Sequence, residues 1–164
     1  MFKPLPLLFL ACSVGAAQAE ERGDLALTID GETYAYDLWA SQSDWSGSAD
    51  YGSLSINARP VDDASPYGAL SLGFSFAGTN ADLGELRVSS VTDGETTRHY
   101  AGEDAEDGAL TVTLASSSVS GEELSVAGSF EGRAGPSDNF GRDIDLAAGM
   151  DIEGTFDVVL APYE

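Results

Sequence analysis

The sequence predicts an all-β domain, a single antiparallel β-sandwich or partly closed barrel of about nine strands. Apolar residues recur at every second position through most of the chain, and glycine and aspartate cluster between these alternating runs. No stretch after the first twenty residues carries the apolar stripe of a long helix. The alternation also argues against a buried parallel sheet, whose strands are apolar on both faces.

Two hairpins are predicted from Asp-Gly pairs that interrupt the alternation. In the first, Leu25, Leu27 and Ile29 point to one face before Asp30-Gly31, and the pattern then resumes. The second pair is Asp93-Gly94. Asp-Gly tolerates the positive φ angles of a two-residue turn, so each pair is expected to join neighbouring antiparallel strands.

The other strands follow the same period of two, and the connections between them are the places to look for a site. The nine expected strands span residues 24–30, 33–39, 52–58, 68–77, 85–92, 95–101, 109–115, 122–132 and 151–161. The longer connections are residues 40–51, 59–67, 102–108 and 133–150.

Two late segments, SVAGSFEG and DIEGTFDV, share a Gly-(Ser/Thr)-Phe-acid pattern. By alternation, Gly128 and Phe130 point inward, as do Gly154 and Phe156. A glycine two residues before an aromatic leaves bare backbone that a neighbouring ring can cover. We interpret the repeat as a packing device in which each ring covers the other strand's glycine, with internal duplication as the alternative.

The first 19 residues have the form of a signal peptide. Lys3 precedes an apolar run that ends in Ala17-Gln18-Ala19, which predicts cleavage between Ala19 and Glu20. The run is too short for a permanent membrane anchor, so no transmembrane segment is expected. The mature domain is predicted to comprise residues 20–164 and to be periplasmic or secreted in a bacterium.

Cys12 offers an alternative processing route. It follows Phe-Leu-Ala and resembles the lipidated cysteine of bacterial lipoproteins, which would give a lipid anchor instead of cleavage at Ala19. Cys12 is also the chain's single cysteine, so no disulfide is expected.

The chain is strongly acidic. Its 28 Asp and Glu residues outnumber 7 Lys and Arg, and the formal charge is −21. Such a surface repels phosphate backbones, which argues against a nucleic-acid partner. The acids are spread along the chain, as solubility alone would require, and an acidic binding face is the alternative.

An aromatic connection, LWASQSDWSGSADYGS, is the leading candidate for ligand binding. It places Trp45 and Tyr51 beside Asp44 and Asp50 in a stretch without a strand pattern. Exposed aromatics beside acids are typical of surfaces that contact carbohydrate or protein. The alternative is that Trp45 folds back over an open end of the sandwich.

Calcium is the one cofactor that the sequence suggests. The segment GEDAEDG brings Glu103, Asp104, Glu106 and Asp107 into one short connection, and calcium prefers oxygen ligands. The spacing does not match an EF-hand, so a solvated hairpin tip is the alternative.

Catalysis is not expected. His99 is the single histidine and lies in a polar run, where an exposed position is predicted. Neither a nucleophile elbow nor a phosphate-binding glycine loop occurs. An enzyme would need a deep pocket that holds His99 or a close carboxylate pair.

The ending GTFDVVLAPYE is similar to the C-terminal strand of chaperone–usher pilin subunits in its alternation and its penultimate Tyr163. The resemblance covers about ten residues; Pro162 breaks the alternation, and the cysteines of the usual subunit disulfide are missing. It implies a structural subunit that assembles by strand addition. The leading hypothesis remains an exported, non-enzymatic β-sandwich that binds a protein or carbohydrate ligand through its loops.

Overall fold

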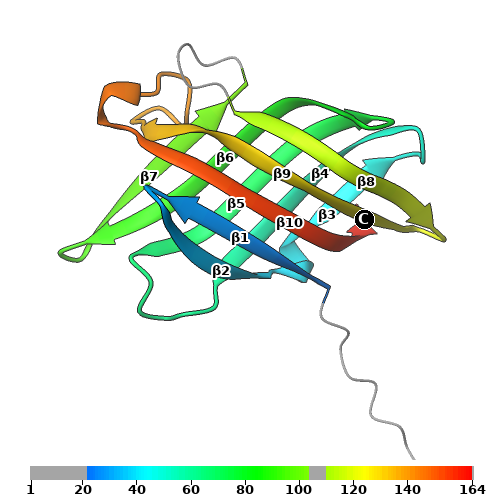
Figure 1. The fold of residues 1–164 in the computed structure, drawn as a ribbon, viewed down its shortest axis with the longest axis horizontal. Coiled ribbons are helices and arrows are strands. Elements are labelled where there is room, and N and C mark those ends of the chain that lie inside the picture. The colour runs from blue at the N-terminus through cyan, green and yellow to red at the C-terminus, as the bar shows by residue number, and fades with distance from the viewer. Residues whose placement is uncertain (1–21, 104–109, 164) are drawn as a thin grey trace, which may run out of the picture.

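The computed structural model describes residues 22–103 and 110–163 and is almost entirely β-structure (Figure 1). The signal-peptide positions, including Cys12, Ala19 and Glu20, lie outside the described residues. The strands are β1 (Gly23–Ile29), β2 (Glu32–Leu38), β3 (Asp44–Gly47), β4 (Tyr51–Pro60), β5 (Tyr67–Ala77), β6 (Asn80–Thr92), β7 (Glu95–Gly102), β8 (Thr111–Ser120), β9 (Glu123–Pro136) and β10 (Met150–Pro162). Two single-turn 3₁₀ helices, η1 (Ala40–Gln42) and η2 (Leu146–Ala148), complete the structure.

The expected all-β fold is confirmed, with one strand more than predicted. All nine expected strands are present, and β3 is the addition. It lies within residues 40–51, which the sequence predicts as a connection. In the described part of the chain, no helix is long and apolar enough to cross a membrane.

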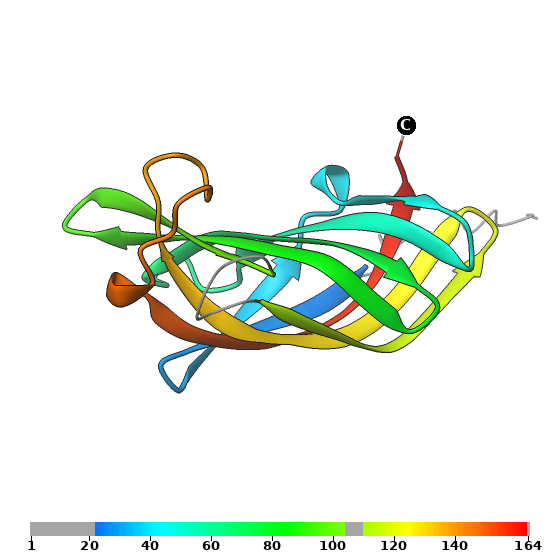
Figure 2. The ribbon, with the colours of Figure 1, turned by 90° about the horizontal axis from the view of Figure 1, so that it is seen from above.

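The strands form two curved layers that face each other across the core (Figure 2). All ten strands belong to one hydrogen-bonded sheet, and we call its two layers the first and the second sheet. The first has the order β2-β1-β10-β9-β8, and the second has the order β3-β4-β5-β6-β7. Every pairing is antiparallel except the short contact of β3 with β10, where Asp44 lies opposite Ala161.

The two sheets are also joined to each other by hydrogen bonds along their sides. On one side Leu38 of β2 pairs with Ala58 of β4, and on the other Tyr100 of β7 pairs with Gly135 of β9. These contacts close a ring of eight strands, with β3 and β8 attached to it. The molecule is therefore a sandwich whose sheets are joined into a partly closed barrel.

Both Asp-Gly hairpins are confirmed. Asp30 and Gly31 have φ values of 50° and 86° between β1 and β2, and Asp93 and Gly94 have 53° and 83° between β6 and β7. Positive φ at both central residues defines the turn that matches the twist of paired strands.

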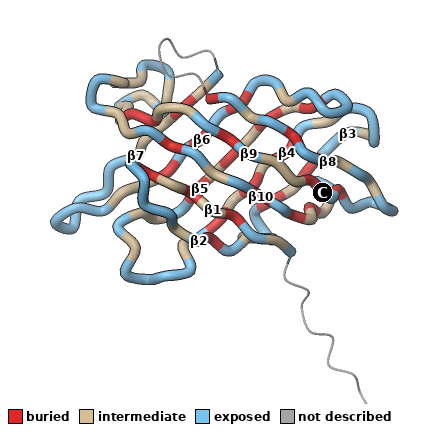
Figure 3. The backbone as a smooth tube through the Cα atoms, in the orientation of Figure 1, coloured by how far each residue is buried: buried red, intermediate tan, exposed pale blue. Residues whose placement is uncertain are grey.

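The alternation seen in the sequence corresponds to burial. Buried positions alternate with half-buried or exposed ones along most of β5, β9 and β10 (Figure 3). The buried positions form one apolar cluster between the sheets. Phe74 of β5 and Phe156 of β10 meet across it with ring centroids 5.7 Å apart.

The repeated Gly-(Ser/Thr)-Phe-acid segments pack as predicted. β9 and β10 are neighbours in a register that sets Gly154 opposite Phe130 and Gly128 opposite Phe156. A Cβ atom on Gly128 would lie 2.8 Å from Cζ of Phe156, and one on Gly154 would overlap the ring of Phe130. Each aromatic ring therefore covers the bare backbone of the neighbouring strand.

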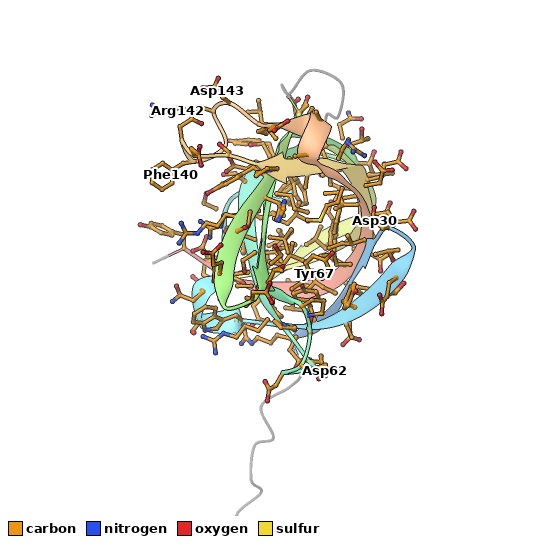
Figure 4. The ribbon with its side chains drawn as sticks, turned by 90° about the vertical axis from the view of Figure 1, so that its left-hand side faces the viewer. Asp30, Asp62, Tyr67, Phe140, Arg142 and Asp143 are labelled. Atoms are coloured by element: carbon orange, nitrogen blue, oxygen red, sulfur yellow. The ribbon has the colours of Figure 1, made fainter. Side chains whose placement is uncertain are left out.

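Tyrosine rings pack at one end of the core. Tyr34 and Tyr67 meet edge to face with centroids 5.0 Å apart, and Tyr67 is seen at this end in Figure 4. Tyr36 lies deeper, is 1% exposed, and its hydroxyl finds no hydrogen-bond partner among the described residues. Burial raises the pKa of Tyr34 to about 12 and that of Tyr36 further, so these phenols stay neutral.

Candidate functional site

Trp45 of the predicted aromatic site lies in the core. It is 5% exposed, and its indole N–H donates to the carbonyl oxygen of Glu122 at 3.0 Å. The segment around it is strand β3, which pairs with β4 so that Trp45 lies opposite the buried Leu54. The side chain closes one end of the sandwich, which is the alternative that the sequence left open.

The other residues of that predicted site do not share an aromatic surface with Trp45. Tyr51 begins β4 and is 66% exposed, while Asp50 is exposed beside it. Asp44 is half-buried on β3. Trp39 holds the guanidinium of Arg59 at 3.4 Å from its ring centroid, so this ring already has a cation on its face.

The calcium prediction falls largely outside the described residues, because Asp104, Glu106 and Asp107 lie there. Glu103 is described and exposed, and its carboxylate accepts the N–H of Gly84 at 3.0 Å. Among the residues that the structure describes, no three His, Cys, Asp or Glu side chains gather as a metal site requires.

His99 is half-buried on β7, not exposed as the sequence predicts. Its Nε2 lies 3.0 Å from the hydroxyl of Ser90, and its Nδ1 is buried with no partner in the described chain. Burial lowers the pKa of the imidazole because it disfavours the charged form.

Two strained residues mark a different surface. Among the residues that the structure describes, four other than glycine have positive φ; two are the hairpin aspartates, and the others are Leu83 (56°) and Phe140 (62°). Left-handed backbone costs a bulky side chain about 1–2 kcal/mol. Both side chains are nevertheless solvent-exposed, at 62% and 83%, and both line the same hollow. Strain maintained at two exposed apolar residues beside one hollow is the strongest functional signal in the molecule.

A bulge in β6 turns Leu83 outward. Gly73 of β5 pairs with Glu85, but Ser75 pairs with Asp82, so Leu83 and Gly84 together lie opposite one residue of β5. The extra residue takes the left-handed conformation, as bulges often require.

The connection from β9 to β10 carries Phe140 and is anchored at both ends. Near Phe140, Gly141 packs on Tyr100 of β7 so closely that a Cβ would lie 2.9 Å from the ring. At the far end Arg133 donates to the carbonyl oxygens of Leu146 and Gly149, at 2.9 and 2.7 Å.

Further hydrogen bonds fix the same connection. Arg133 also forms an ion pair with Asp151. Within the connection, the side chain of Asn139 bonds to Ser137 and Asp143. Phe140 therefore projects from an anchored loop (Figure 4).

The floor of the hollow is the outer face of the second sheet. One row across β4-β5-β6-β7 reads Ser55, Gly73, Glu85 and Gly102. Two of these four positions are glycines, and the whole hollow has a volume of about 480 Å³.

The neighbouring rows supply polar groups to the same hollow. Ser71, Arg87 and Tyr100 lie side by side on β5, β6 and β7, and Ser53 pairs with Ser75 on the other side of the central row. Serine hydroxyls donate and accept, and arginine donates in a fixed fork. The floor is thus hydrogen-bonding while the walls at Leu83 and Phe140 are apolar.

Few ionisable side chains line the hollow. Glu85 is the single carboxylate among the residues that line the hollow, and they include neither histidine nor cysteine. A glycosidase of the common type needs two carboxylates.

Sequence reasoning missed this site because its key residues, Leu83 and Phe140, are far apart in the chain and come together only in the folded structure. Leu83 breaks the alternation of β6, which was a readable sign of a bulge. Phe140 precedes a glycine in a polar connection, which was a second sign. Neither sign tells that the two side chains face the same hollow.

No family model matches the chain, and no curated protein or solved structure matches it. The function is therefore argued from the geometry of the hollow.

Proposed function

We propose that this chain is an exported, non-enzymatic β-sandwich that binds a saccharide in the hollow between Leu83 and Phe140. The observation that carries the proposal is the strained, exposed placement of these two side chains beside one serine-rich floor. An apolar wall suits the C–H face of a sugar ring, and hydroxyl and guanidinium groups suit its hydroxyls.

Saccharide is favoured over protein as the ligand because of the floor. Protein interfaces carry most of their affinity in buried aromatic and arginine anchors around an apolar centre. Here the floor carries Ser53, Ser55, Ser71 and Ser75 together with Glu85, Arg87 and Tyr100, so it offers hydrogen-bonding groups where such an interface has an apolar centre.

The test is a screen of immobilised oligosaccharides with the purified exported protein, followed by calorimetric titration of the tightest binder. Phe140→Ala and Leu83→Ala should each weaken that binding by roughly tenfold, a typical loss for one apolar anchor. Val61→Ala is the matched control, because Val61 is comparably exposed at 56% but does not line the hollow.

A second control addresses the aromatic connection. If Tyr51→Ala weakened binding while Phe140→Ala and Leu83→Ala did not, the site would be the one around Asp50 and Tyr51, and our proposal would be wrong. Absence of binding to any saccharide on the array would contradict it outright.

The export part of the proposal has its own measurement. Mass spectrometry of the protein recovered from expressing bacteria should show a chain that begins at Glu20. A diacylated Cys12 would replace that processing site with a lipid anchor.

Assembly by strand addition is the second candidate, favoured by one observation. β8 hydrogen-bonds to β9 alone among the described strands and carries no charged residue over Thr111–Ser120. An uncharged edge is a site where another strand can pair. Light scattering that shows oligomers growing with concentration would support it. Against a pilin-like exchange, β10 is already paired with β1 and β9.

A further inference from the structure

We infer that the saccharide bound in this hollow carries a carboxylate, as a uronic acid does, and that Arg87 binds it. The inference rests on the proposed function and adds the charge of the ligand. The described chain has six arginines, and they differ in what their side chains contact.

Three of the other arginines already have partners. Arg22 pairs with Glu123 at 3.1 Å, Arg133 pairs with Asp151, and Arg59 stacks on Trp39. Arg87 lines the hollow, is exposed, and has no carboxylate within 4.0 Å among the described residues. Arg98 and Arg142 likewise have no carboxylate within 4.0 Å in the described chain, but of these three arginines Arg87 is the one that lines the hollow.

The nearest acid on the same strand is directed elsewhere. Glu85 lies two residues before Arg87 and points to the same face of β6. Its side chain leans over Gly73 of β5, where a Cβ would be 3.5 Å from Oε1. Arg87 therefore lines the hollow without a carboxylate partner, with Ser71 and Tyr100 as its neighbours across the sheet.

The two faces of the sandwich differ in charge in the way this inference requires. On the outer face of the first sheet, Asp24 lies between Asp37 and Asp157, and Glu131 lies opposite Glu153. On the outer face of the second sheet, Arg87 lies opposite Ser71 and Arg98 opposite Ser89, and the acids Asp82 and Glu85 are not opposite one another. An anionic ligand is thus repelled by the first face and accepted by the second.

Arginine and carboxylate form paired, charge-assisted hydrogen bonds, which are stronger than neutral ones. The acidity of the whole molecule opposes this attraction only weakly at physiological salt, because charges are screened over about 8 Å. A single carboxylate on a sugar ring stacked against Phe140 therefore meets Arg87 with little penalty from the acids outside the hollow, while Glu85, the acid within it, lies over Gly73.

The experiment compares tri-galacturonic acid with its methyl ester, which differs in charge but keeps the sugar ring. Calorimetric titration at physiological ionic strength should show the wild-type exported protein binding the acid about tenfold more tightly, which corresponds to about 1.4 kcal/mol. In Arg87→Gln this preference should disappear, and in Arg87→Lys part of it should remain.

Two variants separate the possible failures. Arg98→Gln removes a charge from the same face outside the hollow and should keep the preference, while Phe140→Ala should weaken both forms equally. If wild type bound both forms alike, or if Arg87→Gln kept the preference, the inference would be overturned. The proposed function would then still stand provided that Phe140→Ala weakened binding.

Binding of neither form would overturn the inference as well, whatever other saccharide the array identifies. Thermal unfolding midpoints equal to wild type within the error of the measurement establish that each variant is folded. Since Arg87, Arg98 and Phe140 are all exposed, we expect each of these variants to fold.

Discussion

Alanine at Gly154 tests the packing between β9 and β10 that defines the first sheet. The new methyl group would meet the ring of Phe130, with Cε1 2.7 Å away, and also the carbonyl oxygen of Ala26 on β1. Both contacts are shorter than van der Waals distance. The ring can rotate or shift, but the carbonyl belongs to a strand held by hydrogen bonds on both sides.

The expected cost follows from two opposing effects. Alanine is better than glycine inside a strand by about 0.5–1 kcal/mol, since it restricts the unfolded chain. Overpacking of a filled core typically costs about 1–3 kcal/mol, and the immobile carbonyl puts this site at the upper end. We expect a net loss of about 2 kcal/mol, which lowers the melting temperature by about 6 °C in a domain of this size.

Calorimetry and urea unfolding of Gly154→Ala measure this loss, and a matched variant controls for the substitution itself. Gly73→Ala makes the same change on β5, where the nearest atoms, Cγ and Oε1 of Glu85, lie 3.5 Å from the new Cβ. That distance is ordinary contact, so no overpacking cost is expected and the stability should stay equal to wild type or rise by up to about 1 kcal/mol.

A double-mutant comparison with Phe130 shows whether the cost of Gly154→Ala comes from the aromatic ring or from alanine at this position in general. In a Phe130→Leu background the added methyl group no longer meets an aromatic ring, so Gly154→Ala should cost about 1 kcal/mol less than in wild type. If Gly154→Ala were as stable as wild type, or if its cost were the same in both backgrounds, the reciprocal ring-over-glycine packing would not be what holds these strands together.

Three further substitutions test other parts of the structure. Arg133→Gln removes the donors that anchor residues 137–149, so hydrogen exchange in this loop should accelerate and stability should fall by about 1–2 kcal/mol; unchanged exchange would contradict the anchor. Trp39→Phe leaves Trp45 as the single emitter, and its fluorescence should be blue-shifted and protected from iodide, whereas emission typical of exposed indole would contradict its burial. Burial lowers the pKa of His99, so the folded state resists protonation more than the unfolded state. Relative to His99→Gln, wild type should therefore lose stability as pH falls through and below about 6.5, and a constant difference between pH 7.5 and 5.5 would refute this.

Most of the fold was readable from the chain because the signals are local. A period of two residues determines which side chains of a strand share a face, and an Asp-Gly pair determines a turn. Neither signal depends on the rest of the chain. The pairing of Phe130 with Gly154 was also predictable, since two neighbouring strands with the same pattern can satisfy each other. Strand β3 was missed because it has only four residues, too few for a period to stand out.

The sequence by itself determined the all-β class, the faces of the strands, the two hairpin turns and the acidity of the surface. Only the tertiary structure decided that the sheets join into a ring, that Trp45 closes the core, and that Leu83, Arg87 and Phe140 meet at one hollow. The physical reason is separation along the chain. Leu83 and Phe140 come from a bulge and a distant loop, and their proximity depends on long-range pairing that no local pattern encodes.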